Sequence, residues 1–183
     1  DFHGDKAEWV SAYFMDAYAN FSVSEQLNLF AGRTARNLGI PNEYGLFISD
    51  NPYPWDHFGF QATGKRIQYS WYAGRLNDMM GYDDQGVVIA LGKTVRSSRF
   101  IAFQRFDARM TQRMQLGLSS GTLYGGPGHT FEAPYLNPMN FHYLSQRNQR
   151  VQMNGFWQVN YFYHLPNQWA LYFDLFVDDI VIN

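Results

Sequence analysis

The residues of this chain that could do chemistry show none of the spacings that a catalytic centre requires. Residues 91–94, LGKT, resemble the end of a phosphate-binding loop. That loop needs a glycine five residues before the glycine of Gly-Lys-Thr, where this chain has Val87. The five histidines, at positions 3, 57, 129, 142 and 164, form no HExxH pair, and there is no cysteine. We therefore predict a protein that is not an enzyme and holds no metal or cofactor.

A hydrolase is the alternative that the serines leave open. Ser49 with Asp50, or the pair Ser119 and Ser120, would have to meet His142 through the fold alone. No strand carries a nucleophile and a base at matched spacing, which is the local pattern of an activated nucleophile. The sequence does not favour this alternative.

Binding is the chemistry that the polar and aromatic residues favour. Charged groups form strong hydrogen bonds, and aromatic rings offer sugars a large apolar contact area. The candidate glycan-binding residues lie in predicted loops: Asp50, Asn51, Tyr53, Trp55, Tyr135 and Asn137. The candidate charges inside a sheet or barrel are Arg33, Arg36, Arg75, Arg105, Asp174, Asp178 and Asp179. The same charges could instead form salt bridges that hold the sheet, and the aromatics could belong to a membrane-interface belt.

Strands must position these residues, and the clearest pattern is near the C-terminus. From Val151 to Tyr163, apolar residues occupy the odd positions almost without a break, and the pattern resumes from Trp169. Such alternation gives a strand one apolar and one polar face. We predict a hairpin of 151–164 with 169–181, joined by a turn at Pro166, whose odd-numbered apolar residues share one face.

Shorter alternating segments cover much of the remaining chain. We predict strands within 9–23 and 27–32, over 66–76, and in a pair formed by 99–108 and 114–124. Segments rich in glycine, proline and asparagine predict long loops at 33–54 and 125–140, with a short apolar stretch at 46–48. The short turns near Ser24 and Pro166 would lie at one end of the strands, and the long loops at the other end. The pattern indicates one domain over 1–183, with no repeat or linker.

Composition favours a transmembrane β-barrel over a helical membrane protein. The chain is 46% hydrophobic and 19% aromatic, yet its mean hydropathy is only -0.37. No apolar run approaches the roughly 20 residues of a membrane helix, whereas a barrel strand needs only alternate apolar positions. A net charge of -2 gives no reason to expect nucleic acid as a partner. A soluble, aromatic-rich, carbohydrate-binding β-sandwich is the alternative fold.

Four segments resemble, in order, the capsule assembly protein Wzi family. They are GRTARNLGIPNEYGLFISDNPYPWDHF, KRIQYSWYAGRLND, SSGTLYGGPGHTFEAPYLNPMNF and LYFDLFVDDIVI, which together run from Gly32 to Ile182. The resemblance implies an antiparallel outer-membrane β-barrel with a lectin-like role in attaching capsular polysaccharide to the bacterial cell surface. The chain departs from the family in being much shorter than a whole family barrel and in lacking a terminal aromatic residue.

The resulting hypothesis is a non-enzymatic outer-membrane barrel that binds surface polysaccharide and contacts outer-membrane lipid. At about 10–14 residues per strand plus turns, the chain would supply roughly ten strands. We therefore expect an open or partial barrel that belongs to a longer polypeptide. An outer-membrane pore or transport barrel is the alternative function.

Overall fold

The structure, a computed structural model, describes residues 16–36, 46–48, 53–80, 96–126, 128–140 and 153–178. Side chains are described throughout these ranges except at 79–80 and 96–97. The elements in chain order are β1 (Ala17–Ser22), β2 (Leu27–Thr34), β3 (Trp55–Thr63), β4 (Ile67–Met80), β5 (Arg96–Arg109), β6 (Met114–Gly126), α1 (Ala133–Leu136), β7 (Met153–His164) and β8 (Ala170–Asp178).

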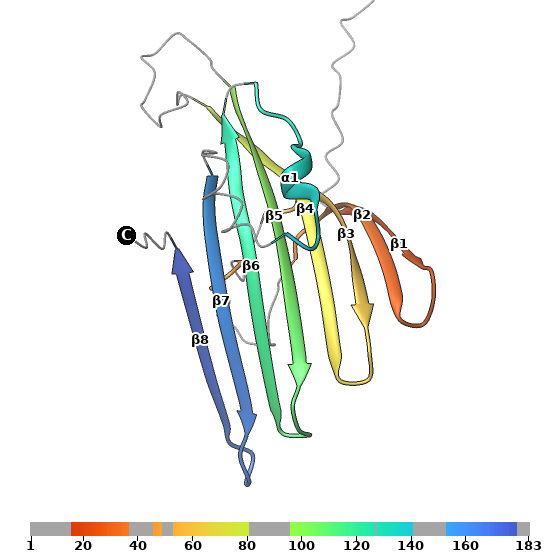
Figure 1. Cartoon of the computed structure of the whole chain (residues 1–183), viewed down its shortest axis with the longest axis vertical. Coiled ribbons are helices and arrows are strands. Elements are labelled where there is room, and N and C mark those ends of the chain that lie inside the picture. Colours follow the sequence, from red (N-terminus) through yellow and green to blue (C-terminus); the bar gives the residue numbers. More distant parts are fainter. Residues whose placement is uncertain are drawn as a thin grey trace, which may run out of the picture.

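All the described strands belong to one antiparallel sheet, in which each strand pairs with its neighbours in sequence. The order of its 8 strands is β1-β2-β3-β4-β5-β6-β7-β8 (Figure 1). In the described residues β1 and β8 are the two edges and do not pair with each other, so the sheet is open. The all-β, antiparallel prediction is confirmed, and the described strands do not close into a barrel.

The predicted C-terminal hairpin is confirmed in its strands and its register. Trp157 lies opposite Val177, and Val159 opposite Leu175, so the odd-numbered apolar residues of both strands share one face. Trp169 precedes β8 and lies in the turn, where it is 72% exposed. The predicted ends at 151–152 and 179–181 lie outside the described residues.

Four other points of the sequence analysis need adjustment. Strand β3 was missed, although Phe58, Phe60 and Ala62 alternate with polar residues and glycine. The predicted first loop is shorter than expected, because β2 extends to Thr34. Likewise β6 extends to Gly126, into the second predicted loop. The predicted strand over 9–23 is described only from Asp16, and β1 covers Ala17–Ser22.

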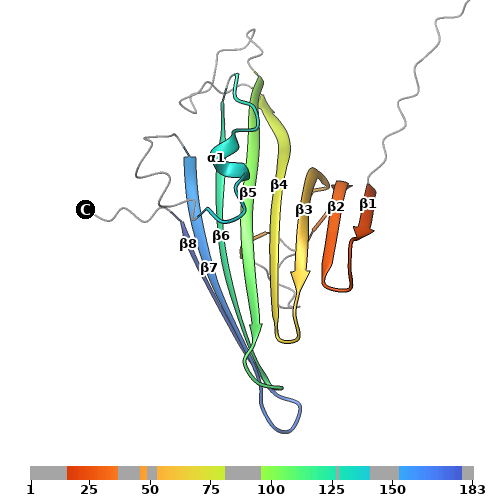
Figure 2. The same cartoon turned by 45° about the vertical axis from the view of Figure 1, so that its right-hand side comes forward.

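Connections of two lengths join the strands at opposite ends of the sheet. The turns at 23–26, 64–66, 110–113 and 165–169 are short, and we call their end the short-turn rim. The connections at 35–54, 81–95 and 127–152 are long, and their end is the long-connection rim. Figure 2 shows the hairpin turns together at one end. This is the arrangement expected from the loop and turn signals.

The two faces of the sheet differ sharply in chemistry. The apolar face carries the odd-numbered residues of β7 and β8, and the register extends it across all strands. Its exposed large side chains are between 39% and 67% exposed: Phe21, Leu29, Phe58, Ile67, Phe106, Leu118, Leu171, Phe173 and Leu175. On the opposite, polar face of the described strands, only Tyr18 is a large hydrophobic residue with such exposure.

Different segments cover the two faces. The segment that contains α1 packs on the apolar face near the long-connection rim, where the Tyr135 ring lies 4.1 Å from that of Tyr124 (Figure 1). Residues 46–48 pack on the polar face, where the Phe47 ring lies 5.4 Å from Phe103 and 5.1 Å from Phe156. In the described residues no helix is both long and apolar enough to cross a membrane.

Glycines on the polar face make room for large side chains of neighbouring strands. A Cβ atom at Gly121 would lie 2.5 Å from Cε2 of Phe156 and 2.7 Å from Cβ of Phe103. A Cβ at Gly117 would lie 2.2 Å from Nη2 of Arg105. A side chain at either position would displace these groups, so the two glycines leave room for the aromatic rings and the guanidinium group.

The turn between β7 and β8 provides a test of the hairpin. Asn167 and Gln168 have φ angles of 66° and 68°, in the left-handed region that side chains other than glycine and asparagine rarely adopt. A left-handed conformation costs a residue such as glutamine roughly 1–2 kcal/mol, and glycine avoids this cost. We expect Gln168→Gly to raise the free energy of unfolding by about 0.5–1 kcal/mol in a urea titration.

Gln112 is the matched control, because it is an exposed glutamine in the short turn between β5 and β6 and its φ is not positive. Gln112→Gly should give no stabilisation. Equal effects of the two substitutions would contradict the left-handed conformation of Gln168.

Candidate functional site

A buried arginine is the centre of the most extensive polar arrangement on the polar face. The Arg105 residue is 3% exposed. Its Nε donates to Oδ2 of Asp107 at 2.9 Å, and its Nη2 donates to Oδ1 at 2.6 Å. The two residues lie on the same strand two positions apart, so their side chains project from the same face. This paired geometry is the strongest form of contact between arginine and a carboxylate.

The third nitrogen of the guanidinium group reaches across two neighbouring strands. Nη1 of Arg105 donates to Oγ of Ser119 on β6 at 3.0 Å and to Oδ1 of Asn160 on β7 at 2.6 Å. A longer bond of 3.5 Å runs to Oε1 of Gln158. Every nitrogen of the buried guanidinium group therefore has an acceptor, which offsets the cost of removing the charge from water.

A second carboxylate continues the arrangement to the edge strand. Both oxygens of Asp174 on β8 accept hydrogen bonds from Nε2 of Gln158, at 2.8 and 2.9 Å. The hydroxyl of Tyr172 donates to Asp174 at 3.0 Å, and the Leu46 N–H donates at 3.4 Å. Asn160 links the two halves, because its Nδ2 donates to the Tyr172 hydroxyl at 3.3 Å.

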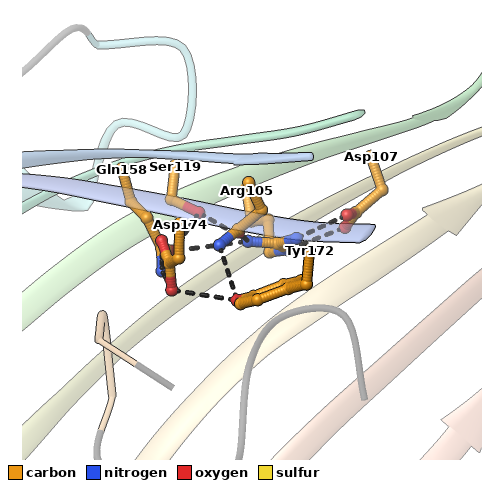
Figure 3. Close-up of polar contacts among 7 residues, drawn as sticks. Arg105, Asp107, Ser119, Gln158, Tyr172 and Asp174 are labelled. Carbon is orange, nitrogen blue, oxygen red and sulfur yellow. Dashed lines mark hydrogen bonds and ion pairs between the residues drawn. The ribbon is translucent and has the colours of Figure 1, made fainter. Parts of the chain in front are cut away.

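Together these side chains form a continuous network across β5 to β8 (Figure 3). We call it the polar network: Arg105, Asp107, Ser119, Gln158, Asn160, Tyr172 and Asp174. The aromatic cluster of Phe47, Phe103, Phe156 and Phe176 lies on the same face. The polar network can hold four strands in register, and its carboxylates can accept hydrogen bonds from a ligand.

The predicted inward charges divide between the two faces. Arg105 and Asp174 are in the polar network, and Asp178 lies opposite Phe156 on the same face. Arg36 also reaches this side, where its Nε bonds to Nε2 of His57 at 2.9 Å and its guanidinium group lies 4.3 Å from the Phe30 ring centre. Asp179 lies outside the described residues.

Two of the predicted inward charges, Arg33 and Arg75, lie instead on the apolar face. Their strand positions have the same parity as the apolar residues of β2 and β4, and both lie opposite Asp56 of β3. Arg33 forms an ion pair with Asp56 at 3.0 Å, and Arg75 forms one with Asp78 at 2.8 Å. These two arginines therefore do not share a face with Arg105 and Asp174, and each forms a salt bridge with a nearby carboxylate.

The predicted glycan-binding aromatics also differ in accessibility. Trp55 is only 5% exposed, at the start of β3, where its ring stacks on His57 at 4.3 Å. Tyr135 is 1% exposed in α1. Neither ring can stack on a sugar in this arrangement, so their prediction as accessible loop residues is wrong. Tyr53, by contrast, is 83% exposed.

The remaining predicted glycan-binding residues lie in or near the long connections. Asn137 is exposed, and its Oδ1 accepts a hydrogen bond from the Met139 N–H at 3.0 Å, after the end of α1. Asp50 and Asn51 lie outside the described residues. Of the six candidates, the described structure therefore offers Tyr53 and Asn137 to a ligand.

Burial also changes the acidity of Tyr135. Loss of solvent raises the pKa of its hydroxyl to about 12, and the nearby Glu132 and Tyr124 act in the same direction. Glu132 itself bonds to Nδ1 of His129 at 2.7 Å. Tyr135 is therefore a neutral packing residue that anchors α1 to the sheet, with no tendency to act as a base.

Comparisons with known proteins found no match for this chain. No family model, curated protein or solved structure matches the chain. Within the described ranges, no group of three or more histidine or acidic side chains could hold a metal ion. The function must therefore be inferred from the two faces and their rims.

The polar network predicts a large difference between two arginines. Arg105→Met should lower the free energy of unfolding by about 3–5 kcal/mol, because it leaves the Asp107 carboxylate without its partner in a largely buried site. Arg33→Met should cost at most about 1 kcal/mol, because its partner Asp56 is largely exposed. Urea titrations of the folded chain would measure both.

A double variant separates loss of the charge pair from loss of packing. Arg105→Met combined with Asp107→Asn should be more stable than Arg105→Met alone, since no unpaired carboxylate is left. Equal costs at Arg33 and Arg105, or no recovery in the double variant, would show that the polar network does not hold the sheet together.

Proposed function

We propose that this chain forms part of the wall of a bacterial outer-membrane β-barrel that binds surface polysaccharide without catalysing a reaction. The apolar face would contact lipid, and the polar face would line the interior. The long-connection rim would face the outside of the cell, as longer loops do in such barrels.

The exposed apolar face is the observation that carries this proposal. Its exposed large side chains come from every described strand except β7, outside the part that the segment with α1 covers, and they far exceed the scattered apolar residues of an ordinary soluble surface. Its counterpart is a polar face whose central charge is buried and fully hydrogen-bonded. Apolar outside and polar inside is the arrangement of a membrane barrel and the reverse of a soluble one.

The packing on the polar face favours a binding wall over a pore. Phe47 contacts rings on β5, β7 and β8, and the Leu46 N–H bonds to Asp174. A chain segment thus occupies the interior side next to the polar network, where a wide channel would need open space. The transport alternative therefore has less support than binding.

Support for a glycan as ligand comes from the long-connection rim and from the sequence resemblance to the Wzi family. Tyr53 lies just before β3 and presents an exposed ring. Such a ring can stack on a sugar, while each neutral hydrogen bond adds only about 0.5–1.5 kcal/mol. Affinity for a polymer would then depend on many repeated weak contacts.

A charge on the apolar face tests contact with lipid. Phe173 is 52% exposed in the middle of β8, opposite Tyr161. Arginine on a lipid-facing surface costs about 2–4 kcal/mol near the membrane centre, whereas exposed substitutions in water usually change stability by less than about 0.5 kcal/mol. Phe173→Arg should therefore strongly reduce the folded, membrane-inserted fraction in lipid vesicles.

Gln112→Arg is the control, because it adds the same charge in a short turn outside the strands. It should insert like the wild type. A Phe173→Arg variant that inserts normally, or a wild-type chain that stays dissolved and monomeric without detergent or lipid, would refute the membrane assignment.

Replacement of Tyr53 tests glycan binding at the outer rim. Tyr53→Ala removes the exposed ring. It should lower the amount of polysaccharide retained on cells, when that amount is divided by the amount of folded protein in the membrane. Trp169→Ala removes an equally accessible ring at the short-turn rim and should leave retention unchanged. Labelled lectin or antibody bound to intact cells would give the retained amount. Equal retention in the wild type and Tyr53→Ala would exclude this ring from binding.

A further inference from the structure

A polar hollow of about 330 Å³ lies at the short-turn rim, away from the glycan-binding residues considered so far. The turn between β3 and β4 contributes Lys65 and Arg66, and the end of β5 contributes Arg109. Gln68 and Gln115 line it from β4 and β6, and Asp107 from β5. The register places these last three side chains and Arg109 on the polar face.

The charges of this hollow do not balance. Lys65, Arg66 and Arg109 are all exposed, and none of them forms an ion pair in the described part of the chain. Asp107 is the one carboxylate in the lining, and both its oxygens already accept hydrogen bonds from Arg105. The Arg105 charge cancels that of Asp107, so the three cations are left without a counter-charge.

The backbone places the two residues that carry the arginine charges side by side. The Arg109 N–H donates to the Arg66 carbonyl at 2.7 Å, and the Gly64 N–H donates to the Ile67 carbonyl at 2.7 Å. The turn at 64–66 and the end of β5 are therefore tied together. Two arginine side chains that start from neighbouring backbone positions can reach one anion together.

We propose that this hollow binds an anionic group, a carboxylate or a phosphate, at the rim opposite the one proposed to bind the glycan. The inference rests on the proposed barrel, in which the short-turn rim faces the periplasm, and names the chemical class: an anionic ligand on that side of the membrane. Guanidinium groups bind planar carboxylates and phosphates through paired hydrogen bonds, and the lysine adds a point charge. The amides of Gln68 and Gln115 can donate hydrogen bonds to the same anionic group.

The test uses the whole chain folded in detergent micelles, with binding measured by titration calorimetry. The probes are an oligogalacturonate, inorganic phosphate and a neutral malto-oligosaccharide. We expect the oligogalacturonate, the phosphate or both to bind, with affinity falling as salt rises, because exposed charges are screened. Arg66→Gln and Arg109→Gln should each weaken binding about tenfold.

Arg113→Gln is the matched control, because Arg113 is an exposed arginine in the next short turn and does not line the hollow. It should bind like the wild type. Binding of the uronate alone would identify a carboxylate site, and binding of phosphate alone a phosphate site.

Three results would overturn the inference. They are an equal loss in Arg113→Gln, equal affinity for the neutral oligosaccharide, and no binding of either anion. A chain that inserts into vesicles and retains polysaccharide through Tyr53, but binds no anion, would remove this site and leave the proposed function intact.

Discussion

The structure depends on one constraint: neighbouring residues of a paired strand must face opposite surroundings. Arg105 and Phe106 show its consequence most clearly. The arginine is 3% exposed within the polar network, and the next side chain is 39% exposed on the apolar face. A shift of one residue in register would exchange these positions, placing the charge on the apolar face and the phenyl ring among polar groups. Bonds from Arg105 to β6 and β7, and from Gln158 to Asp174 on β8, oppose such a shift.

The same constraint explains how much of the fold could be predicted from the sequence. Where alternation was strict, as in β7 and β8, the pairing and the shared face were predicted correctly. Strand β3 was missed because Pro52 and Pro54, just before it, are typical of a loop. In addition, one of the positions that alternate with its apolar residues is Gly59, and glycine is typical of turns. In the structure that glycine lies beneath the Phe30 ring, so its role is steric and depends on a residue far away in sequence.

The candidate site was predicted less well, because burial depends on contacts that a local pattern does not contain. The residues around Trp55 and Tyr135 have the composition of a loop. In the structure Trp55 is buried at the start of β3, and Tyr135 is buried where α1 packs on the sheet. Arg33 and Arg75 were assigned by charge alone, whereas the parity of their strand positions would have placed them with the apolar residues. Parity would also have identified Gln158 and Asn160, since they alternate with Trp157 and Val159.

The most direct test of the central claim is the accessibility of the two faces of β8 in a lipid bilayer. The chain contains no cysteine, so single cysteines can carry spin labels without background. Labels at Leu171, Phe173 and Leu175 would report on the apolar face, and labels at Ala170 and Asp178 on the polar face. The account predicts that the first three are accessible to lipid-soluble oxygen and the other two to a water-soluble nickel reagent. Equal access of the nickel reagent to all five positions would contradict it.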